Sequence, residues 1–192
     1  STIGHIACVD PAPSGNSRRI LWRMTNTHST LVASDNLQST TRRPLRTIVT
    51  AGLVAGALDI SYAFIIWGLQ GVTPLRIGRS IASGLLGRDA ASAGGTATGL
   101  LGLLLHFTMA TIIAAIFYFA ARNIRMLVER AVPFGIAYGL VTYGVMNYVV
   151  LPLSAIGAVG DSGPAYIRIT GVLVHMFLIG LPIALITRKD LR

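Results

Sequence analysis

Long apolar runs alternate with short polar segments along this chain, and the runs are long enough to cross a membrane. The clearest run, residues 99–119, has 21 residues with no charge and a single histidine, His106. An α-helix rises ~1.5 Å per residue, so ~20 apolar residues span the ~30 Å hydrocarbon layer of a bilayer. The pattern predicts four transmembrane helices, at about 47–70, 95–121, 131–153 and 168–187. The expected fold class is therefore an all-α, integral membrane four-helix bundle.

The first 45 residues have a different character. Residues 1–45 are rich in Ser, Thr, Asn and Arg and show neither a helical nor a strand period. This predicts a disordered basic N-terminal tail, followed by a four-transmembrane-helix domain at 46–189. The tail lacks the apolar region of a secretory signal, although its Arg-rich, acid-poor composition also resembles a transit peptide. Met24 is an alternative start, which would make residues 1–23 an extension.

An amphipathic stretch lies between the first two predicted helices. Residues 75–88 combine Leu and Ile with Arg76, Arg79 and Arg88. The stretch is too short to span a bilayer. We expect either a helix lying on the membrane surface or a re-entrant segment.

Composition supports a membrane protein and narrows its partners. The chain is 53% hydrophobic and 12% charged, about half the ~25% charge of soluble domains. Its net charge of +9 comes from basic residues in the tail and at helix ends. That distribution favours the lipid bilayer and anionic lipid head groups as partners, and argues against nucleic acid. The single cysteine, Cys8, excludes an internal disulfide and a Cys-based zinc site.

The basic residues also predict an orientation. With four helices, both termini and the 122–130 loop lie on one side, whose flanks carry nine Arg and Lys. The other side carries four, namely Arg76, Arg79, Arg88 and Arg168. Cytoplasmic flanks of membrane proteins carry the excess of basic residues, so both termini are expected to be cytoplasmic.

The second and fourth helices resemble each other. Residues 102–116 align without a gap with 171–185, and His106 falls on His175. Helices one and three share a Gly-xxx-Gly start, at Gly52 and Gly135. A 2+2 repeat of two tandem helical hairpins, related by an axis along the membrane normal, explains both likenesses. The alternative is that apolar helices resemble each other by composition alone.

A polar cluster is expected near the midplane of the bundle. Counted at ~1.5 Å per residue from the cytoplasmic ends, Asp59 and His175 lie at a depth of ~18 Å, and His106 and Asn147 at ~22–24 Å. A charged side chain at this depth costs ~2.5–3.5 kcal/mol. We therefore expect Asp59 to face the bundle interior and to have a partner, for which either histidine serves.

Glycines four residues apart are expected to let helices pack closely, because they remove the side chains that separate two backbones. The candidate helix-packing glycines are Gly52, Gly56, Gly95, Gly99, Gly135 and Gly139. The tyrosines of helices two and three are interpreted as core or interfacial residues rather than as a ligand cage.

Several functions fit these residues. The leading interpretation is a structural or accessory membrane component in which the midplane cluster forms an interhelical hydrogen-bond network. The alternatives are a proton- or ion-coupled transporter or channel component that uses Asp59, His106 and His175, and a haem- or metal-binding protein. Two histidines can supply haem nitrogens, and with Asp59 they can hold a divalent metal. An enzyme is not indicated, because Ser61 and Ser154 have no Gly-x-Ser-x-Gly frame.

Five sequence blocks resemble a family of small uncharacterised four-helix bacterial inner-membrane proteins. The blocks are GLVAGALDISYAF (52–64), SIASGLLG (80–87), LLLHF (103–107), MNYVVLPLS (146–154) and HMFLIGLP (175–182). The resemblance covers about 47–187. It implies a four-helix, multi-pass protein of the bacterial cytoplasmic (inner) membrane without an established activity. The resemblance supplies no site residues and no cofactor. Separately from the resemblance, a homo-oligomer and a larger membrane complex are both compatible with the predicted helices.

Overall fold

The structure, a computed structural model, describes residues 44–157 and 164–192. The chain divides into two units, Ser1–Arg42 and Arg43–Arg192, and all described residues belong to the second. The expected disordered tail thus lies outside the described residues, except that Pro44 and Leu45 already belong to the first helix.

Every regular element in the described part of the chain is a helix, as the expected fold class requires. Four helices are long and apolar enough to span a membrane: Pro44–Gly68, Gly95–Asn123, Ala131–Leu153 and Ala165–Leu191. The all-α helical bundle is therefore confirmed, and these helices are those of a multi-pass membrane protein. The labelled elements are α2 (Pro74–Leu86), α3 (Arg88–Ala93), α4 (Gly95–Asn123), α5 (Arg125–Glu129), α6 (Ala131–Val145), η1 (Met146–Val150), α7 (Leu151–Leu153), α8 (Ala165–Val174), η2 (His175–Gly180) and α9 (Leu181–Leu191).

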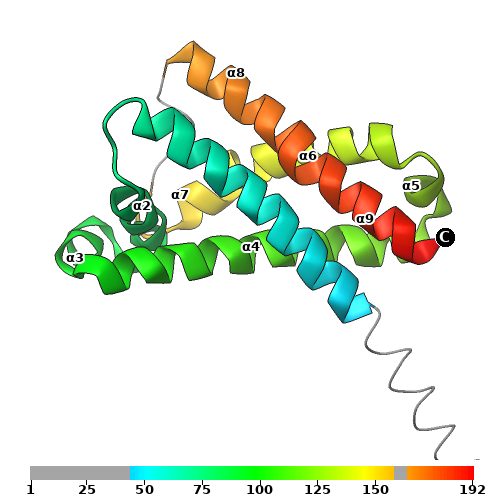
Figure 1. Cartoon of the computed structure of the whole chain (residues 1–192), viewed down its shortest axis with the longest axis horizontal. Coiled ribbons are helices and arrows are strands. Elements are labelled where there is room, and N and C mark those ends of the chain that lie inside the picture. The colour runs from blue at the N-terminus through cyan, green and yellow to red at the C-terminus, as the bar shows by residue number, and fades with distance from the viewer. Residues whose placement is uncertain (1–43, 158–163) are drawn as a thin grey trace, which may run out of the picture. The chain divides into compact units, whose positions relative to one another are not determined.

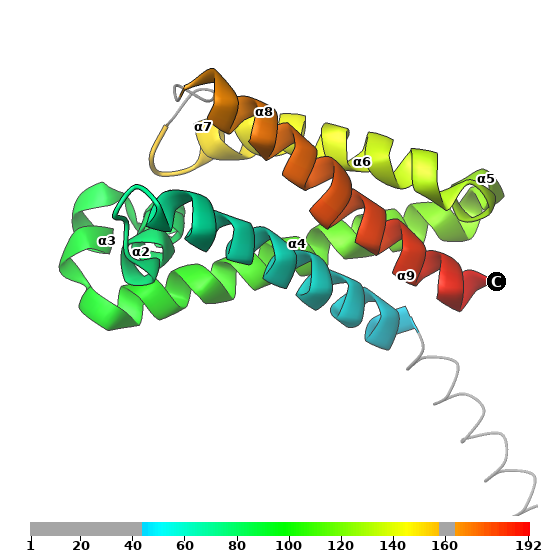
Figure 2. The ribbon, with the colours of Figure 1, turned by 45° about the horizontal axis from the view of Figure 1, so that its top comes forward.

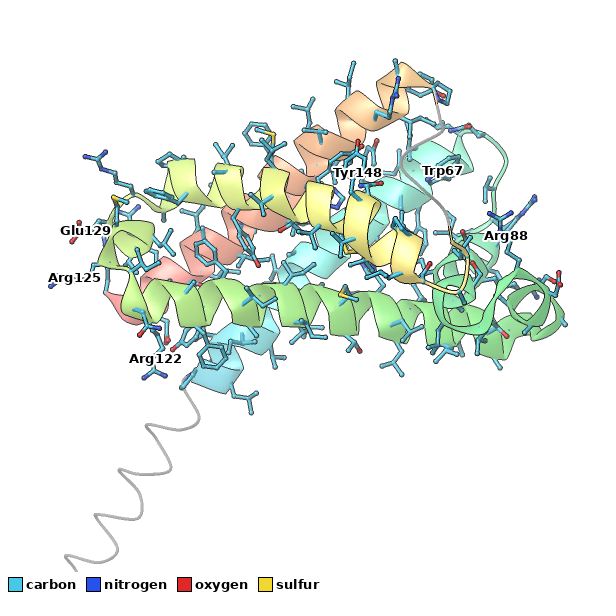
Figure 3. The ribbon with its side chains drawn as sticks, turned by 180° about the vertical axis from the view of Figure 1, so that it is seen from behind. Trp67, Arg88, Arg122, Arg125, Glu129 and Tyr148 are labelled. Atoms are coloured by element: carbon cyan, nitrogen blue, oxygen red, sulfur yellow. The ribbon has the colours of Figure 1, made fainter. Side chains whose placement is uncertain are left out.

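The long helices alternate in direction, so their connections gather at two ends. The start of the first helix, α5 and the C-terminus lie at one end, which we call the terminal end (Figure 1). At the opposite end, the loop end, lie α2, α3, α7 and the start of α8 (Figure 1). The first helix lies beside α4, and α6 lies beside the run from α8 to α9 (Figure 2). Arg122, Arg125 and Glu129 mark the terminal end, whereas Trp67 and Arg88 mark the loop end (Figure 3).

Glycines set the close approach within each of these two helix pairs. A Cβ added to Gly52 would lie 2.6 Å from the Cα of Thr111, and one added to Gly56 would lie 2.9 Å from the ring of Phe107. In the second pair, a Cβ on Gly135 would lie 3.1 Å from the Cα of Leu181. Only residues without side chains let helix backbones approach this closely.

The two pairs use the same register. Gly52 faces Thr111 in the first pair, and Gly135 faces Gly180 in the second. Thr111 and Gly180 occupy one column of the ungapped alignment of 102–116 with 171–185. In the same way Gly56 faces Phe107, and Gly139 faces the aligned Met176. Aligned positions therefore make the same interhelical contact in both halves.

Two of the expected packing glycines have other surroundings. Gly99 packs against Leu75 of α2 rather than against another long helix. Gly95 has open space where a Cβ would lie, and its φ of +62° falls in the left-handed region that favours glycine. It begins α4 after a turn, so its role is conformational and not the close helix packing expected from the sequence.

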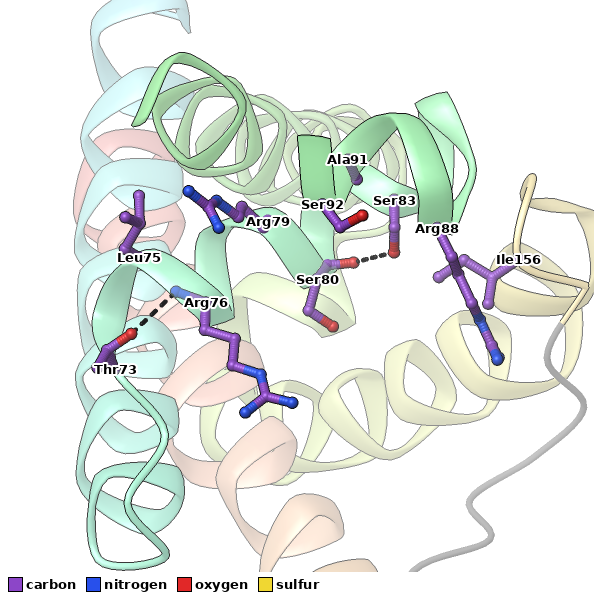
Figure 4. Close-up of a pocket in the computed structure, with 10 residues that line it drawn as sticks. All are labelled: Thr73, Leu75, Arg76, Arg79, Ser80, Ser83, Arg88, Ala91, Ser92 and Ile156. Carbon is purple, nitrogen blue, oxygen red and sulfur yellow. Dashed lines mark hydrogen bonds between the residues drawn. The ribbon is translucent and has the colours of Figure 1, made fainter. Parts of the chain in front are cut away.

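Helix α2 crosses the start of α4. Gly78 lies against Gly99 and Gly102, and Ala82 contacts Gly102 as well. In Figure 4, α4 is seen nearly end-on and α2 runs across the view, so the two axes cross steeply and α2 lies across the end of α4. Of the two expectations for 75–88, this placement favours a helix on the membrane surface.

Small side chains dominate the buried core. It consists of Ala51, Ala55, Ala114, Phe117, Ala121, Ala131, Ile179, Ile183 and Ala184. In a lipid environment the hydrophobic effect does not drive helices together, so close packing has to stabilise their association. Alanine permits this packing because its side chain is small. Most of these positions lie towards the terminal end, so that end is the more tightly packed.

Both second-half helices contain a π-helical turn just before a proline. The N–H of Leu151 bonds to the carbonyl of Met146, five residues back, and the N–H of Leu181 bonds to Met176. Pro152 and Pro182 follow directly. A proline ring clashes with the carbonyl four residues earlier, and the wider π turn relieves that clash. Asn147 and His175 lie in these two π turns.

Candidate functional site

The first helix and α4 bring Asp59 and His106 together. Nε2 of His106 lies 2.9 Å from the carbonyl oxygen of Gly56 and 3.9 Å from Oδ2 of Asp59. A carbonyl oxygen only accepts hydrogen bonds, so Nε2 is the donor in the first contact. The distance to Asp59 exceeds that of a hydrogen bond. The carboxylate therefore acts on the ring by charge, and the attraction is strongest when the imidazole is protonated.

Glycine packing places this pair. Gly56 leaves no Cβ between the first helix and Phe107, the neighbour of His106 in α4. The imidazole can therefore reach across to a main-chain carbonyl of the facing helix. The side chains of Asp59 and His106 are 22% and 15% exposed, so both are largely withdrawn from the lipid-facing surface. Asp59 has the partner that its depth predicted, and that partner is His106.

The other two members of the expected cluster lie in the second half and bond within their own helices. Nδ1 of His175 donates to the carbonyl of Gly171 at 2.9 Å, and Nδ2 of Asn147 donates to the carbonyl of Tyr143 at 2.9 Å. The rings of His175 and Tyr143 also meet edge to face, with centroids 5.3 Å apart. The four residues thus form two groups, one in each half.

The described residues do not form the three-ligand metal centre considered above. In residues 44–157 and 164–192, no three His, Cys, Asp or Glu side chains come together in a way that could hold a metal ion. The two serines considered for hydrolysis also bond locally. Ser61 donates to the carbonyl of Ala57 at 2.6 Å, and Ser154 donates to that of Leu151 at 2.7 Å. A haem held by the two histidines stays a prediction, which one UV–visible spectrum of the purified protein tests.

Three tyrosine hydroxyls join the two halves, a feature the sequence reasoning missed. Tyr118 bonds to Oδ2 of Asp190 at 2.9 Å. Tyr138 bonds to the carbonyl of Ile113 at 2.7 Å. Tyr62 bonds to Oγ1 of Thr170 at 2.6 Å. We call these three contacts the tyrosine bridges. The only sequence indication of them was the presence of tyrosines inside apolar helices, which does not identify their acceptors.

Comparison with known proteins adds no assignment. No family model, curated protein or solved structure matches the chain. The resemblance to inner-membrane proteins drawn from the five sequence blocks therefore stays a prediction. The candidate site therefore consists of the half-buried carboxylate–imidazole pair of Asp59 and His106 between two helices, and of the separate ring contact between Tyr143 and His175.

Proposed function

We propose that this chain is a non-enzymatic structural or accessory component of a membrane. In it, the Asp59–His106 pair holds the first helix against α4. One observation supports the proposal: the histidines and the asparagine of the midplane cluster each bond within their own half. His106 bonds across its own helix pair, whereas His175 and Asn147 bond to carbonyls one turn away. The His106–Gly56 bond joins two helices, and an interhelical hydrogen bond is worth ~0.6 kcal/mol on average.

A second candidate rests on the same pair. A carboxylate inside a membrane span with an imidazole 3.9 Å away is made of the groups that carry protons through membranes. In this alternative the chain is a subunit of a proton- or ion-coupled transporter or channel, and Asp59 and His106 exchange the proton. The two candidates differ in what happens when Asp59 loses its charge.

The deciding experiment is reconstitution of the purified full chain in liposomes, with proton and cation flux measured across a range of pH. For a structural component we expect no flux that depends on Asp59. Asp59→Asn tests the carboxylate, and Ser61→Ala is the matched control, because Ser61 lies on the same helix and its hydroxyl bonds to the carbonyl of Ala57 in the preceding turn. A flux present in the unmodified protein and in Ser61→Ala, but lost in Asp59→Asn, would establish the transport alternative.

Stability measurements give the complementary prediction. His106→Ala removes the bond to Gly56 and leaves Asp59 without its partner, so it should lower the free energy of unfolding by about 1–3 kcal/mol. His175→Ala removes only a bond within one helix and an edge-to-face ring contact, so its effect should be smaller. Denaturant unfolding in detergent compares the two. Equal losses, or a larger loss in His175→Ala, would contradict a structural role for the Asp59–His106 pair.

We place the chain in a bacterial cytoplasmic membrane with both termini in the cytoplasm. Seven basic residues support this orientation at the terminal end of the described chain: Arg46, Arg122, Arg125, Arg130, Arg188, Lys189 and Arg192. A fluorescent protein fused after Arg192 should mature and emit light, because it folds in the cytoplasm. Activity of a periplasm-dependent phosphatase at the same fusion point would reverse the orientation.

A further inference from the structure

An open pocket lies at the loop end, away from the Asp59–His106 pair. Its volume is about 600 Å³. Helices α2 and α3 form most of it, and Ile156, which follows α7, closes one side (Figure 4). The main-chain N–H of Ala155 bonds to the carbonyl of Gly84 at 2.8 Å, which holds Ile156 against α2. The lining residues are Thr73, Leu75, Arg76, Arg79, Ser80, Ser83, Arg88, Ala91, Ser92 and Ile156.

Three arginines and no acidic residue line this pocket. The side chain of Arg79 is held in place by a hydrogen bond, because its Nε donates to the carbonyl of Gly95 at 2.9 Å. Among the described residues, neither Arg76 nor Arg88 forms an ion pair. Figure 4 shows Arg76 and Arg88 extending to the same open side, whereas Arg79 points away from it. Two guanidinium groups therefore face one space without a counter-charge from the part of the chain that the structure describes.

The hydroxyl groups add a donor to the same side. The hydroxyl of Ser83 donates a hydrogen bond to the carbonyl of Ser80 at 2.6 Å, and that of Ser92 donates to the carbonyl of Asp89 at 2.8 Å. The hydroxyl of Ser80 has no acceptor among the described residues, and it lies between Arg76 and Arg88 in Figure 4. Two guanidinium groups and a hydroxyl on one side of a pocket without an acid suit an anion, and the planar guanidinium group matches the oxygens of a phosphate in particular.

The remaining lining and the position of the pocket indicate the source of that anion. Ile156 gives the pocket an apolar side next to Arg88, whereas Leu75 lies at the other end and packs on Gly99 of α4. Helix α2 crosses α4 at the end of a membrane span and exposes Leu85 and Leu86, at 60% and 42%. A helix placed in this way lies at the level of the lipid head groups. A free inorganic anion would contact only the basic part of the pocket. A lipid would contact the basic part with its phosphate and the apolar side with its acyl chains.

We propose that this pocket binds the phosphate group of an anionic membrane lipid, with Arg76 and Arg88 as its charged contacts and Ile156 against the start of its acyl chains. The proposal requires only that the four long helices span the bilayer. It does not depend on the role of Asp59 and His106. Its site lies in the leaflet opposite the terminal end, so it is separate from the basic residues of that end.

The test measures dissociation constants of the purified full chain in detergent micelles by native mass spectrometry. The probes are a phosphatidylglycerol, a phosphatidylcholine with the same acyl chains, and inorganic phosphate. Phosphatidylglycerol should bind most tightly. Arg76→Gln with Arg88→Gln should weaken that binding about tenfold or more, because two charge-assisted contacts are lost. The matched control, Arg122→Gln with Arg125→Gln, removes the same charge at the terminal end and should leave the dissociation constant unchanged.

Three results would overturn the proposal. They are inorganic phosphate binding as tightly as phosphatidylglycerol, phosphatidylcholine binding equally well, and an equal loss of affinity in the control variant. Should the double variant fail to fold, Arg88→Gln alone carries the comparison against Arg122→Gln alone. Arg88 is an exposed side chain that forms no ion pair within the described chain. Arg79 is left intact throughout, because its bond to Gly95 holds α2 on α4.

Discussion

Individual glycines determine how closely the long helices of this protein approach. Gly139 faces the main chain of His175 and Met176, whereas Gly144, five residues later in the same span, faces open space. The sequence alone does not separate the two, because both are glycines in an apolar helix. The same limit applies to the polar cluster. Depth follows from the rise per residue, so Asp59 and His106 could be placed in one layer. Which members meet depends on the rotation of each helix, which four isolated residues do not fix.

Gly139→Ala should therefore destabilise the protein, whereas Gly144→Ala should not. A Cβ at position 139 would lie 2.6 Å from the Cα of Met176, so the helices would have to separate. Overpacking of this kind costs about 1–3 kcal/mol. At position 144 alanine meets nothing, and its higher helix propensity keeps or raises the free energy of unfolding. Thermal unfolding in detergent measures both, and equal stability of the two variants would refute the close contact at Gly139.

At the scale of elements, the lengths of the apolar runs predicted where the membrane spans lie. They did not predict the local geometry within those helices. The predicted helix at 131–153 coincides with Ala131–Leu153, and the predicted 168–187 lies inside Ala165–Leu191. Helix ends differ by a few residues because polar residues at the membrane surface continue the helical hydrogen bonding. The π turns before Pro152 and Pro182 could not be predicted, since proline indicates an irregularity without specifying its form. The docking of α2 depends on Gly78, which belongs to no four-residue glycine spacing within its own helix.

Gly78→Ala should loosen α2 from α4. The new Cβ would lie 2.5 Å from the carbonyl oxygen of Gly99, a main-chain atom that cannot rotate away. Hydrogen–deuterium exchange should then become faster across α2, because a helix of 13 residues is marginal once it loses its packing surface. Gly84→Ala is the control, because its Cβ would lie at an ordinary 3.7 Å from that of Ser154. Unchanged exchange in Gly78→Ala would show that α2 is held elsewhere.

At the scale of the whole molecule, two similar helix pairs are joined by a few directional contacts. Each pair has its own glycine register, and the tyrosine bridges of Tyr62, Tyr118 and Tyr138 connect the pairs at three depths. The rings of Phe117 and Tyr138 add a contact with centroids 5.0 Å apart. An alanine-rich interface has few interlocking side chains, so directional bonds contribute more to fixing the relative position of the halves.

Replacing Tyr62, Tyr118 and Tyr138 together by phenylalanine should weaken the association of the halves and leave each helix pair intact. Each lost bond costs about 0.6 kcal/mol in a membrane, so the combined loss is about 2 kcal/mol. The control replaces Tyr148 and Tyr166, which are 68% and 51% exposed, and should have no effect. Denaturant unfolding monitored by circular dichroism distinguishes them. A triple variant as stable as the control would show that the bridges do not hold the halves together.

The shared glycine register has a consequence for how such a chain can change over evolutionary time. Contacts made by main chain against main chain constrain the spacing of small residues and leave the identity of the surrounding side chains largely free. Residues 102–116 and 171–185 illustrate this, because Thr111 in one half and Gly180 in the other make the same contact although only Thr111 has a side chain. In a bundle of this kind, we expect the intervals between small residues to change more slowly than the residues that lie between them.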